Sequence, residues 1–295
     1  MAWSLVAANV DGTVVAAALG EDGRIQEIDV LPAGITPMDV FMQWDMYAPI
    51  LQSWDIKASR TLEGATIGQP LRYPRKLICI GANYRDHRAE MAADAEGAKA
   101  NPFFFLKPPT TALIGTGEDI PIRSEEDRVD WEAEIAIIIG KGGRFISKED
   151  ALGSIAGITL ANDISARGVH RQPHAVAPPF SYDWLASKSQ DGFCPIGPGI
   201  LPIWFVDNVE DVPFSLSVNG ETHQSSTTAY TVTSVLDQVV AASNWMTLEA
   251  GDVILTGTPA GVGAGKGIFL KDGDEVIVSS PLLGDLVNRV RVIRR

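Results

Sequence analysis

The sequence predicts a mixed α+β fold in which strands dominate. Short apolar runs rich in Val and Ile recur along the chain, whereas few stretches have the spacing of an amphipathic helix. The runs do not alternate regularly with helices, which disfavours a doubly wound parallel sheet and favours a mixed or rolled β core. Asp11-Gly12 and Asn219-Gly220 lie between apolar runs and are typical of tight hairpins.

Residues 1–72 are expected to form a small N-terminal α/β accessory domain. Two β-like runs, SLVAANV and TVVAAALG, flank the Asp11-Gly12 turn, and a helix-like segment follows over roughly residues 37–53. A polar stretch, EGATIGQP, then leads to the Pro-flanked RYPRKLICIG, which is the candidate boundary. Residues 73–295 form the second, larger domain.

The larger domain is expected to be mostly β. NYRDHRAEMAADA is predicted as a helix with Asn83 as its N-cap, and TVTSVLDQVVAASNW as an amphipathic helix. The expected strands are LICIG, WEAEIAIIIG, GITLANDIS, VPFSLSVNGETHQ, GDVILTG and DEVIVSSPLLGDLVNRVRVI.

Composition excludes several classes of protein. The 295 residues carry 24 Lys+Arg and 37 Asp+Glu, a net charge of -13, which argues against binding nucleic acid. The N-terminal stretch has no basic residue before Arg24, and no run reaches the ~18 apolar residues of a membrane span, so we expect a cytoplasmic protein without membrane contact. Cys79 and Cys194 lie among apolar residues and are expected to be buried, reduced thiols. The acidic run over residues 118–130 is expected to be mostly solvated and without function.

Three carboxylates on two expected strands are candidates for a metal site. Glu132 and Glu134 share one face of the strand in DWEAEIAIIIG, and burying two unpaired carboxylates there is costly unless a divalent cation offsets their charge. The alternative is a solvated face, although the isoleucines that follow suggest burial on both faces. With Asp163 from GITLANDIS, otherwise a cap or turn residue, they would form an all-oxygen site suited to Mg²⁺ or Mn²⁺.

The segment NYRDHRAE contains a candidate general base. On a helix His87 and Glu90 face the same side, and a carboxylate beside an imidazole fixes its tautomer and raises its basicity. Tyr84 would share this face and could pack or donate a hydrogen bond. The alternative is a surface His–Glu pair on a polar helix.

Three further segments could contact a substrate. Lys188 lies between apolar and small residues, so it could be partly buried and stabilise an oxyanion or hold a carboxylate; an exposed loop lysine is the alternative. Residues 168–183 lack periodicity and contain His170, which we expect to contact substrate. The glycine-rich LTGTPAGVGAGKG fails the phosphate-loop pattern, but its backbone N–H groups could hold an anion.

Read in order, seven segments resemble the fumarylacetoacetate hydrolase superfamily. They are GANYRDHRAE, PFFFLKPPTTA, DWEAEIAIIIGKGGR, GITLANDISAR, LASKSQDGFCPIGPGI, SVNGETHQ and LEAGDVILTGTPAGVG. Each segment is modest by itself, but their shared order argues against chance. The first seventy residues resemble only the variable N-terminal extension of bacterial members.

The resemblance implies a β-roll catalytic domain, usually in a homodimer. It also implies one divalent cation per subunit, Mg²⁺ or Mn²⁺, on Glu132, Glu134 and Asp163. Family members mostly act on 2-oxo acids, often 2,4-diketo acids, so a small molecule of this class is the expected partner.

The resemblance also assigns roles to single residues. It makes His87 and Glu90 a catalytic dyad, and Lys188 the lysine that supports an oxyanion or an enolate. Arg167 matches an active-site arginine, and Thr258 matches a residue near the substrate carboxylate.

We therefore expect a metal-dependent hydrolase that cleaves a C–C bond in acylpyruvate-like substrates to give pyruvate and a carboxylic acid. One alternative is a decarboxylase of oxaloacetate-like 2-oxo acids, or an isomerase, because stabilising an enolate serves these reactions too. Another is a 2-oxo-acid-binding protein without efficient catalysis. Two departures from the family pattern, His170 for Gln and Gly192 for Thr, are expected near the substrate and suggest a divergent acyl pocket.

Overall fold

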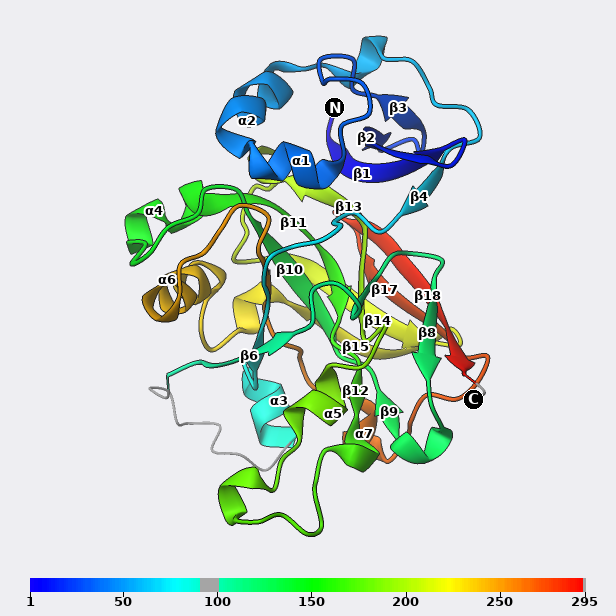
Figure 1. The fold of residues 1–295 in the computed structure, drawn as a ribbon, viewed down its shortest axis with the longest axis vertical. Helices are drawn as coiled ribbons and strands as arrows, with labels where there is room; N and C mark the ends of the chain where they lie inside the picture. Colours follow the sequence, from blue (N-terminus) through cyan, green and yellow to red (C-terminus); the bar gives the residue numbers. More distant parts are fainter. Residues whose placement is uncertain (91–100, 294–295) are drawn as a thin grey trace.

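The computed structural model describes residues 1–90 and 101–293. In this part of the chain, strands form one 11-stranded sheet, one five-stranded sheet and one pair of short strands (Figure 1). The large sheet has the order β3-β2-β1-β13-β11-β10-β16-β5-β6, and most neighbours in it are antiparallel. The predicted strand-dominated, mixed α+β class is confirmed.

The N-terminal elements form a β-hairpin followed by two helices. Asp11 and Gly12 close the hairpin with positive φ angles of 49° and 83°, as the dipeptide predicted. The expected single helix is divided at Gln43, which ends the first helix and precedes the second. The elements are β1 (Trp3–Val10), β2 (Thr13–Gly20), β3 (Ile25–Glu27), α1 (Pro37–Met42), α2 (Trp44–Ser53) and β4 (Thr66–Gly68).

This N-terminal unit continues the large sheet. Strand β1 pairs with β13 (Cys194–Pro202), with Leu5 opposite Ile200. The unit lies at one end of the molecule, above the remaining strands (Figure 1). The domain boundary after residue 72 remains a prediction.

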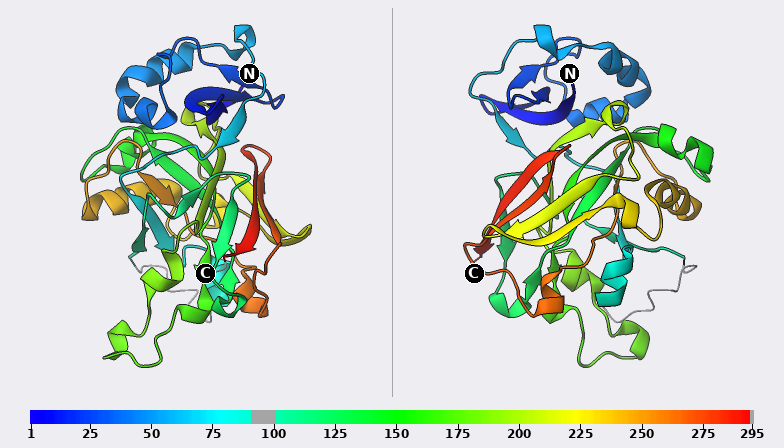
Figure 2. Two further views of the ribbon diagram at one scale, coloured as in Figure 1. Left: turned by 45° about the vertical axis from the view of Figure 1, so that its right-hand side comes forward. Right: turned by 180° about the vertical axis from the view of Figure 1, so that it is seen from behind.

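The central strands of the large sheet are buried on both faces. Ile135, Ile137 and Ile139 of β10 pack toward the five-stranded sheet, whereas Ala136 and Ile138 pack toward the N-terminal helices. Seen from behind, the yellow and red strands of the five-stranded sheet cross the green strands (Figure 2). The remaining strands of the large sheet are β5 (Leu77–Gly81), β6 (Phe103–Lys107), β7 (Leu113–Ile114), β10 (Ala133–Ile139), β11 (Ile155–Asn162) and β16 (Val253–Leu255).

The five-stranded sheet contains the second predicted hairpin. Asn219 and Gly220 connect β14 to β15 with φ angles of 51° and 82°. Its strands are β8 (Asp119–Ile122), β14 (Pro213–Val218), β15 (Glu221–Thr227), β17 (Glu275–Ser280) and β18 (Gly284–Val292), and the separate strand pair is β9 (Val129–Asp130) with β12 (Ser165–Ala166).

Five further α-helices lie among the described residues. They are α3 (Arg85–Glu90), α4 (Lys148–Ser154), α5 (Trp184–Lys188), α6 (Val235–Trp245) and α7 (Gly263–Lys266). Helix α3 begins after the predicted cap: the amide of Asn83 donates to the carbonyls of Thr233 and Thr256 instead. The predicted continuation of this helix beyond Glu90 lies outside the described residues.

No helix in the described part of the chain is long and apolar enough to cross a membrane.

Candidate active site

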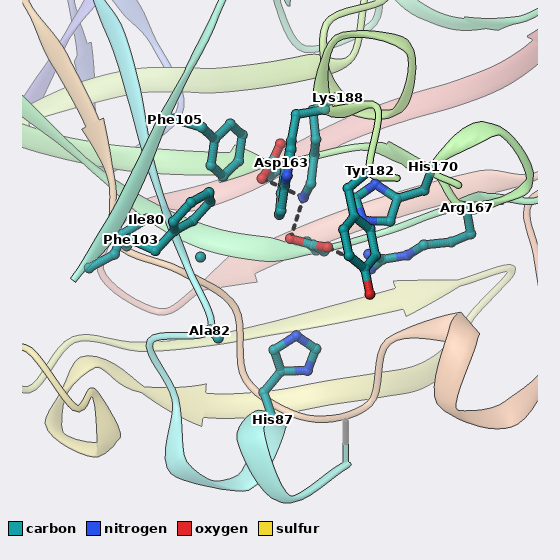
Figure 3. Close-up of a pocket in the computed structure, with 13 residues that line it drawn as sticks. Ile80, Ala82, His87, Phe103, Phe105, Asp163, Arg167, His170, Tyr182 and Lys188 are labelled. Carbon is teal, nitrogen blue, oxygen red and sulfur yellow. Dashed lines mark hydrogen bonds and ion pairs between the residues drawn. The ribbon is translucent and has the colours of Figure 1, made fainter. Parts of the chain in front are cut away.

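A cavity of about 500 Å³ opens between β5, β6, α3, α5 and the segment that follows β12. In Figure 3, Phe103 and Phe105 border one side of it, Arg167, His170 and Tyr182 the other, and His87 points in from below. The lining residues are Ile80, Gly81, Ala82, His87, Phe103, Phe105, Glu132, Asp163, Arg167, His170, Tyr182, Trp184 and Lys188.

Antiparallel pairing brings the three predicted carboxylates together. Glu132 directly precedes β10, Glu134 lies in β10, and Asp163 directly follows the neighbouring β11. An oxygen of each lies within 4.8 Å of the other two. The exposed fractions of Glu132, Glu134 and Asp163 are 7%, 1% and 1%, so the solvated-face alternative does not apply.

Lys188 forms ion pairs with two of these carboxylates. Its Nζ donates to Oε2 of Glu132 at 2.8 Å and to Oδ2 of Asp163 at 2.7 Å. Only 5% of its side chain is exposed, so the exposed-loop alternative is excluded. Burial by itself would lower the pKa of Lys188, but the charges of Asp163 and Glu132 outweigh it and raise this pKa above its usual value.

Arg167 connects the carboxylates to a fourth acid. Its Nη2 donates to Oε1 of Glu132 at 2.6 Å, and its Nε donates to Oδ2 of Asp130 at 2.9 Å. Asp130 also accepts the backbone N–H groups of Gly263 at 2.6 Å and Ala264 at 3.0 Å. The predicted active-site arginine is therefore held in place by a buried carboxylate.

Two residues of this cluster are absent from the sequence-based prediction. Lys107, at the end of β6, is fully buried and forms an ion pair with Asp163. Asp130 is also fully buried, although it ends the acidic run that we expected to be solvated. The sequence does contain one sign of this role: Lys107 lies in the apolar run FFFLKPP, and a buried lysine is almost always paired with an acid.

The cluster has more negative than positive side chains. Burial by itself would raise the pKa of Glu132, but the charges of Lys188 and Arg167 outweigh it and hold this pKa well below its usual range. Burial and the charges of Asp163 and Glu132 raise the pKa of Glu134 well above its usual range. The four carboxylates of the cluster are Asp130, Glu132, Glu134 and Asp163, and its three cations are Lys107, Arg167 and Lys188.

The carboxylate triad fits a hard divalent cation. Every candidate ligand atom is an oxygen, which Mg²⁺ and Mn²⁺ prefer. Within the described residues no cation pairs with Glu134, whose Oε2 accepts one hydrogen bond from the backbone N–H of Gly257 at 2.5 Å. A divalent ion would supply the missing positive charge, so the residues present fit a metal.

His87 and Glu90 form the predicted pair on α3. Nδ1 of His87 lies 3.1 Å from Oε2 of Glu90, and the other carboxylate oxygen accepts the N–H of Gly261 at 3.2 Å. Burial would raise the pKa of Glu90, but these two hydrogen bonds outweigh it and lower this pKa. The His87 side chain is only 6% exposed and lines the cavity, so the surface-pair alternative does not apply.

His170 lines the cavity, as expected for a substrate contact. Its ring lies 5.1 Å from that of Tyr182 and 4.9 Å from that of Trp184, measured between centroids. Burial and the charges of Arg167 and Lys188 lower the pKa of His170, which favours its neutral imidazole.

Three predicted substrate neighbours are not among the residues that line this cavity. Tyr84 precedes α3, and its fully buried ring packs in the core, 6.3 Å from the ring of Phe214. The hydroxyl of Thr258 is buried and donates to the carbonyl of Ala133 at 2.9 Å. Gly192 has φ 72°, and a Cβ there would meet Pro121 at 2.3 Å, so packing excludes a larger residue.

Both cysteines are free and buried, as predicted. Burial raises the pKa of Cys194 to about 12 and that of Cys79 well above its usual value. Such thiols stay protonated at neutral pH, which argues against a nucleophilic role.

Comparisons with known sequences and structures point to one protein family. A family model for the C-terminal part of fumarylacetoacetate (FAA) hydrolase matches residues 76–291. The chain is 37% identical to the mitochondrial oxaloacetate tautomerase FAHD2A of Bos taurus over 223 residues, which are 75% of this chain and 68% of that protein. Two solved structures are similar. They are a fumarylacetoacetate hydrolase from Exiguobacterium antarcticum (TM-score 0.80, 30% identity, 99% and 100% of the chains covered) and a 5-carboxymethyl-2-hydroxymuconate delta-isomerase from Mycobacterium smegmatis (TM-score 0.76, 30% identity, 100% of both).

Proposed function

The chain belongs to the fumarylacetoacetate hydrolase family, and from this premise we propose that it is a metal-dependent isomerase that interconverts the keto and enol forms of a 2-oxo acid. The observation that carries the proposal is the position of His87 in one cavity with the carboxylate–lysine cluster. The relatives named as an oxaloacetate tautomerase and a delta-isomerase support this reaction over hydrolytic C–C cleavage.

Glu132, Glu134 and Asp163 are proposed to hold one Mg²⁺ or Mn²⁺. When bound, this ion supplies the Lewis acidity that stabilises negative charge on the 2-oxo oxygen. Lys188 keeps its proton, because its pKa is raised, and donates a hydrogen bond toward the same developing charge. Arg167 orients Glu132 from the opposite side.

His87 is proposed to move the proton. Glu90 accepts a hydrogen bond from the Nδ1–H of His87, which leaves Nε2 as the basic atom. Nε2 removes a proton from C3, and the electron pair of the C–H bond forms the C2–C3 double bond while the carbonyl π electrons move to the C2 oxygen. The imidazolium then returns the proton to that oxygen, which completes the enol without an attacking water.

The test is tautomerisation of a 2-oxo acid, followed by the ultraviolet absorbance of its enol, with Mn²⁺ or with chelator. We expect the interconversion to depend on the metal and to be lost in the His87→Ala variant. Interconversion at the uncatalysed rate in the presence of Mn²⁺ would refute it.

A second candidate is hydrolysis of 2,4-diketo acids to pyruvate and a carboxylic acid. The His87–Glu90 pair favours it, because a base in this position could also activate water. Pyruvate release from an acylpyruvate distinguishes this activity from tautomerisation. Decarboxylation of oxaloacetate needs no attacking water, so it should persist in the His87→Ala variant, whereas hydrolysis should not.

A further inference from the structure

We propose that the 2-oxo acid bound in this cavity carries a planar aromatic ring on C3 in place of the second carboxylate of oxaloacetate. The inference rests on the proposed tautomerase function and names its substrate class. It is drawn from three features of the described residues: a wall of aromatic rings, the distance from that wall to Lys188, and the charge balance of the buried cluster.

Aromatic side chains form a continuous wall on the cavity. Phe103, Phe105 and Trp184 make a three-ring cluster with centroid distances of 5.1, 5.1 and 6.4 Å. The rings of His170 and Tyr182 extend it from the other side of Trp184. Aromatic rings at these separations attract one another in offset or edge-to-face geometry, so a planar ring is a suitable addition to the cluster.

The aromatic wall adjoins the group proposed to contact the 2-oxo oxygen. Nζ of Lys188 lies 5.5 Å from the centroid of the Phe105 ring. A substrate whose C1 and C2 oxygens face Lys188 would therefore lie beside the aromatic wall, with a ring on C3 within its reach. Phe103 and Tyr182 are 51% and 46% exposed, and a bound ring would cover part of this apolar surface.

The charge of the buried cluster matches a single carboxylate. With all four carboxylates ionised, as a divalent ion bound to Glu134 would require, the cluster and the ion together would carry an excess of one positive charge. The C1 carboxylate of the substrate neutralises that excess. A second carboxylate would enter a largely apolar space in which Lys188 and Arg167, the permanent cations among the described lining residues, already have carboxylate partners.

The cavity is large enough to hold a substrate that carries an aromatic ring. Its volume of about 500 Å³ lies within the ~300–1,000 Å³ that is typical of sites for larger organic ligands. A four-carbon diacid would leave much of this space to water in contact with Phe103, Phe105 and Trp184.

The first experiment compares kcat/KM for phenylpyruvate and oxaloacetate in the Mn²⁺-loaded enzyme. We expect a preference for phenylpyruvate of at least about tenfold, the scale of one good aromatic contact beyond simple burial. Trp184→Ala should lower kcat/KM for phenylpyruvate about tenfold and that for oxaloacetate less than about threefold. Phe103→Ala, on the edge strand β6, should shift the preference in the same direction without disturbing the core. Trp245→Ala is the matched control, because Trp245 is 66% exposed at the end of α6.

The second readout is binding without turnover. Calorimetry with Mn²⁺ present compares oxamate with its phenyl derivative oxanilate, both unreactive analogues of a 2-oxo acid. We expect oxanilate to bind at least about tenfold more tightly, and expect Trp184→Ala to remove most of that difference.

The outcomes separate this inference from the proposed function. Tautomerisation of oxaloacetate in preference to phenylpyruvate, or equal binding of oxamate and oxanilate, would overturn the aromatic substrate class and leave the tautomerase. Tighter binding of oxanilate without turnover of either keto acid would support the aromatic site and refute the tautomerase.

Discussion

Replacing Glu134 with Gln should weaken metal binding and stabilise the metal-free protein at the same time. Gln has the same shape and still accepts the N–H of Gly257, so the substitution removes a charge without removing the hydrogen bond. In the metal-free protein, Glu134 is a buried carboxyl group beside Glu132 and Asp163 without a cationic partner among the described residues. The negative charge on Glu134, which would help to bind a metal ion, is therefore unfavourable when no ion is bound.

The size of the effect follows from the separation of the three carboxylates. Two carboxylates at most 4.8 Å apart repel each other by at least about 3.5 kcal/mol at an effective dielectric constant of about 20, and a divalent ion bound among them would attract each carboxylate more strongly because it carries twice the charge. Losing one anionic ligand should therefore lower metal affinity at least about a hundredfold. With Mn²⁺ at about 100 times the wild-type Kd, binding adds about 2.7 kcal/mol to the wild type and about 0.4 kcal/mol to the variant. The expected rises in Tm are roughly 5–10 °C and 1–2 °C.

Thermal unfolding with and without Mn²⁺ measures both effects on the same samples. The variant should have a higher Tm than the wild type in chelator, and a much smaller rise when Mn²⁺ is added. A variant that unfolds several degrees lower in chelator, yet gains as much from Mn²⁺ as the wild type, would refute the assignment of Glu134 as a ligand.

Three further predictions concern the same cluster. Lys107→Met removes a fully buried cation from Asp163 and should cost about 3–5 kcal/mol in urea denaturation, whereas Lys148→Met, which breaks an exposed surface pair, should leave the stability nearly unchanged; similar losses would contradict the structural role of Lys107. His87→Ala should lower kcat for tautomerisation about 10²–10⁴-fold and leave the Mn²⁺-induced rise in Tm unchanged, and a kcat close to wild type would exclude His87 as the base. In chelator, the free energy of unfolding should fall as pH rises from about 5 to 8, because Glu134 ionises near its ordinary pKa when unfolded and well above it when folded; the same slope in Glu134→Gln would argue against this cause.

Much of the site could be predicted because its residues lie in regular local patterns. Glu132 and Glu134 are two apart beside a strand, so their shared face follows from the strand period alone. The position of Asp163 at the end of a second apolar strand made it a candidate, and the pairing of β10 with β11 explains why it is adjacent. His87 and Glu90 depend only on the helical spacing of three residues.

The remaining residues depend on tertiary packing that no local pattern contains. Lys107 reaches Asp163 from a strand 56 positions earlier, and Asp130 meets Arg167 and the start of α7 only after folding. Tyr84 directly precedes α3 and its ring packs against Phe214, an arrangement that helical spacing alone does not predict, and its contact with a substrate stays a prediction. The glycine at position 192 fits its contact with Pro121 and its positive φ; it is not among the cavity-lining residues, and its position near a substrate stays a prediction.

The most direct test of the proposed reaction is hydrogen exchange at C3 of a 2-oxo acid in deuterated water, followed by proton NMR. If His87 catalyses the isomerisation, the Mn²⁺-loaded enzyme should exchange the C3 protons faster than the uncatalysed rate and leave the carbon skeleton intact. The His87→Ala variant should exchange these protons only at the uncatalysed rate. Release of pyruvate from an acylpyruvate, with no exchange into any intact 2-oxo acid, would contradict it.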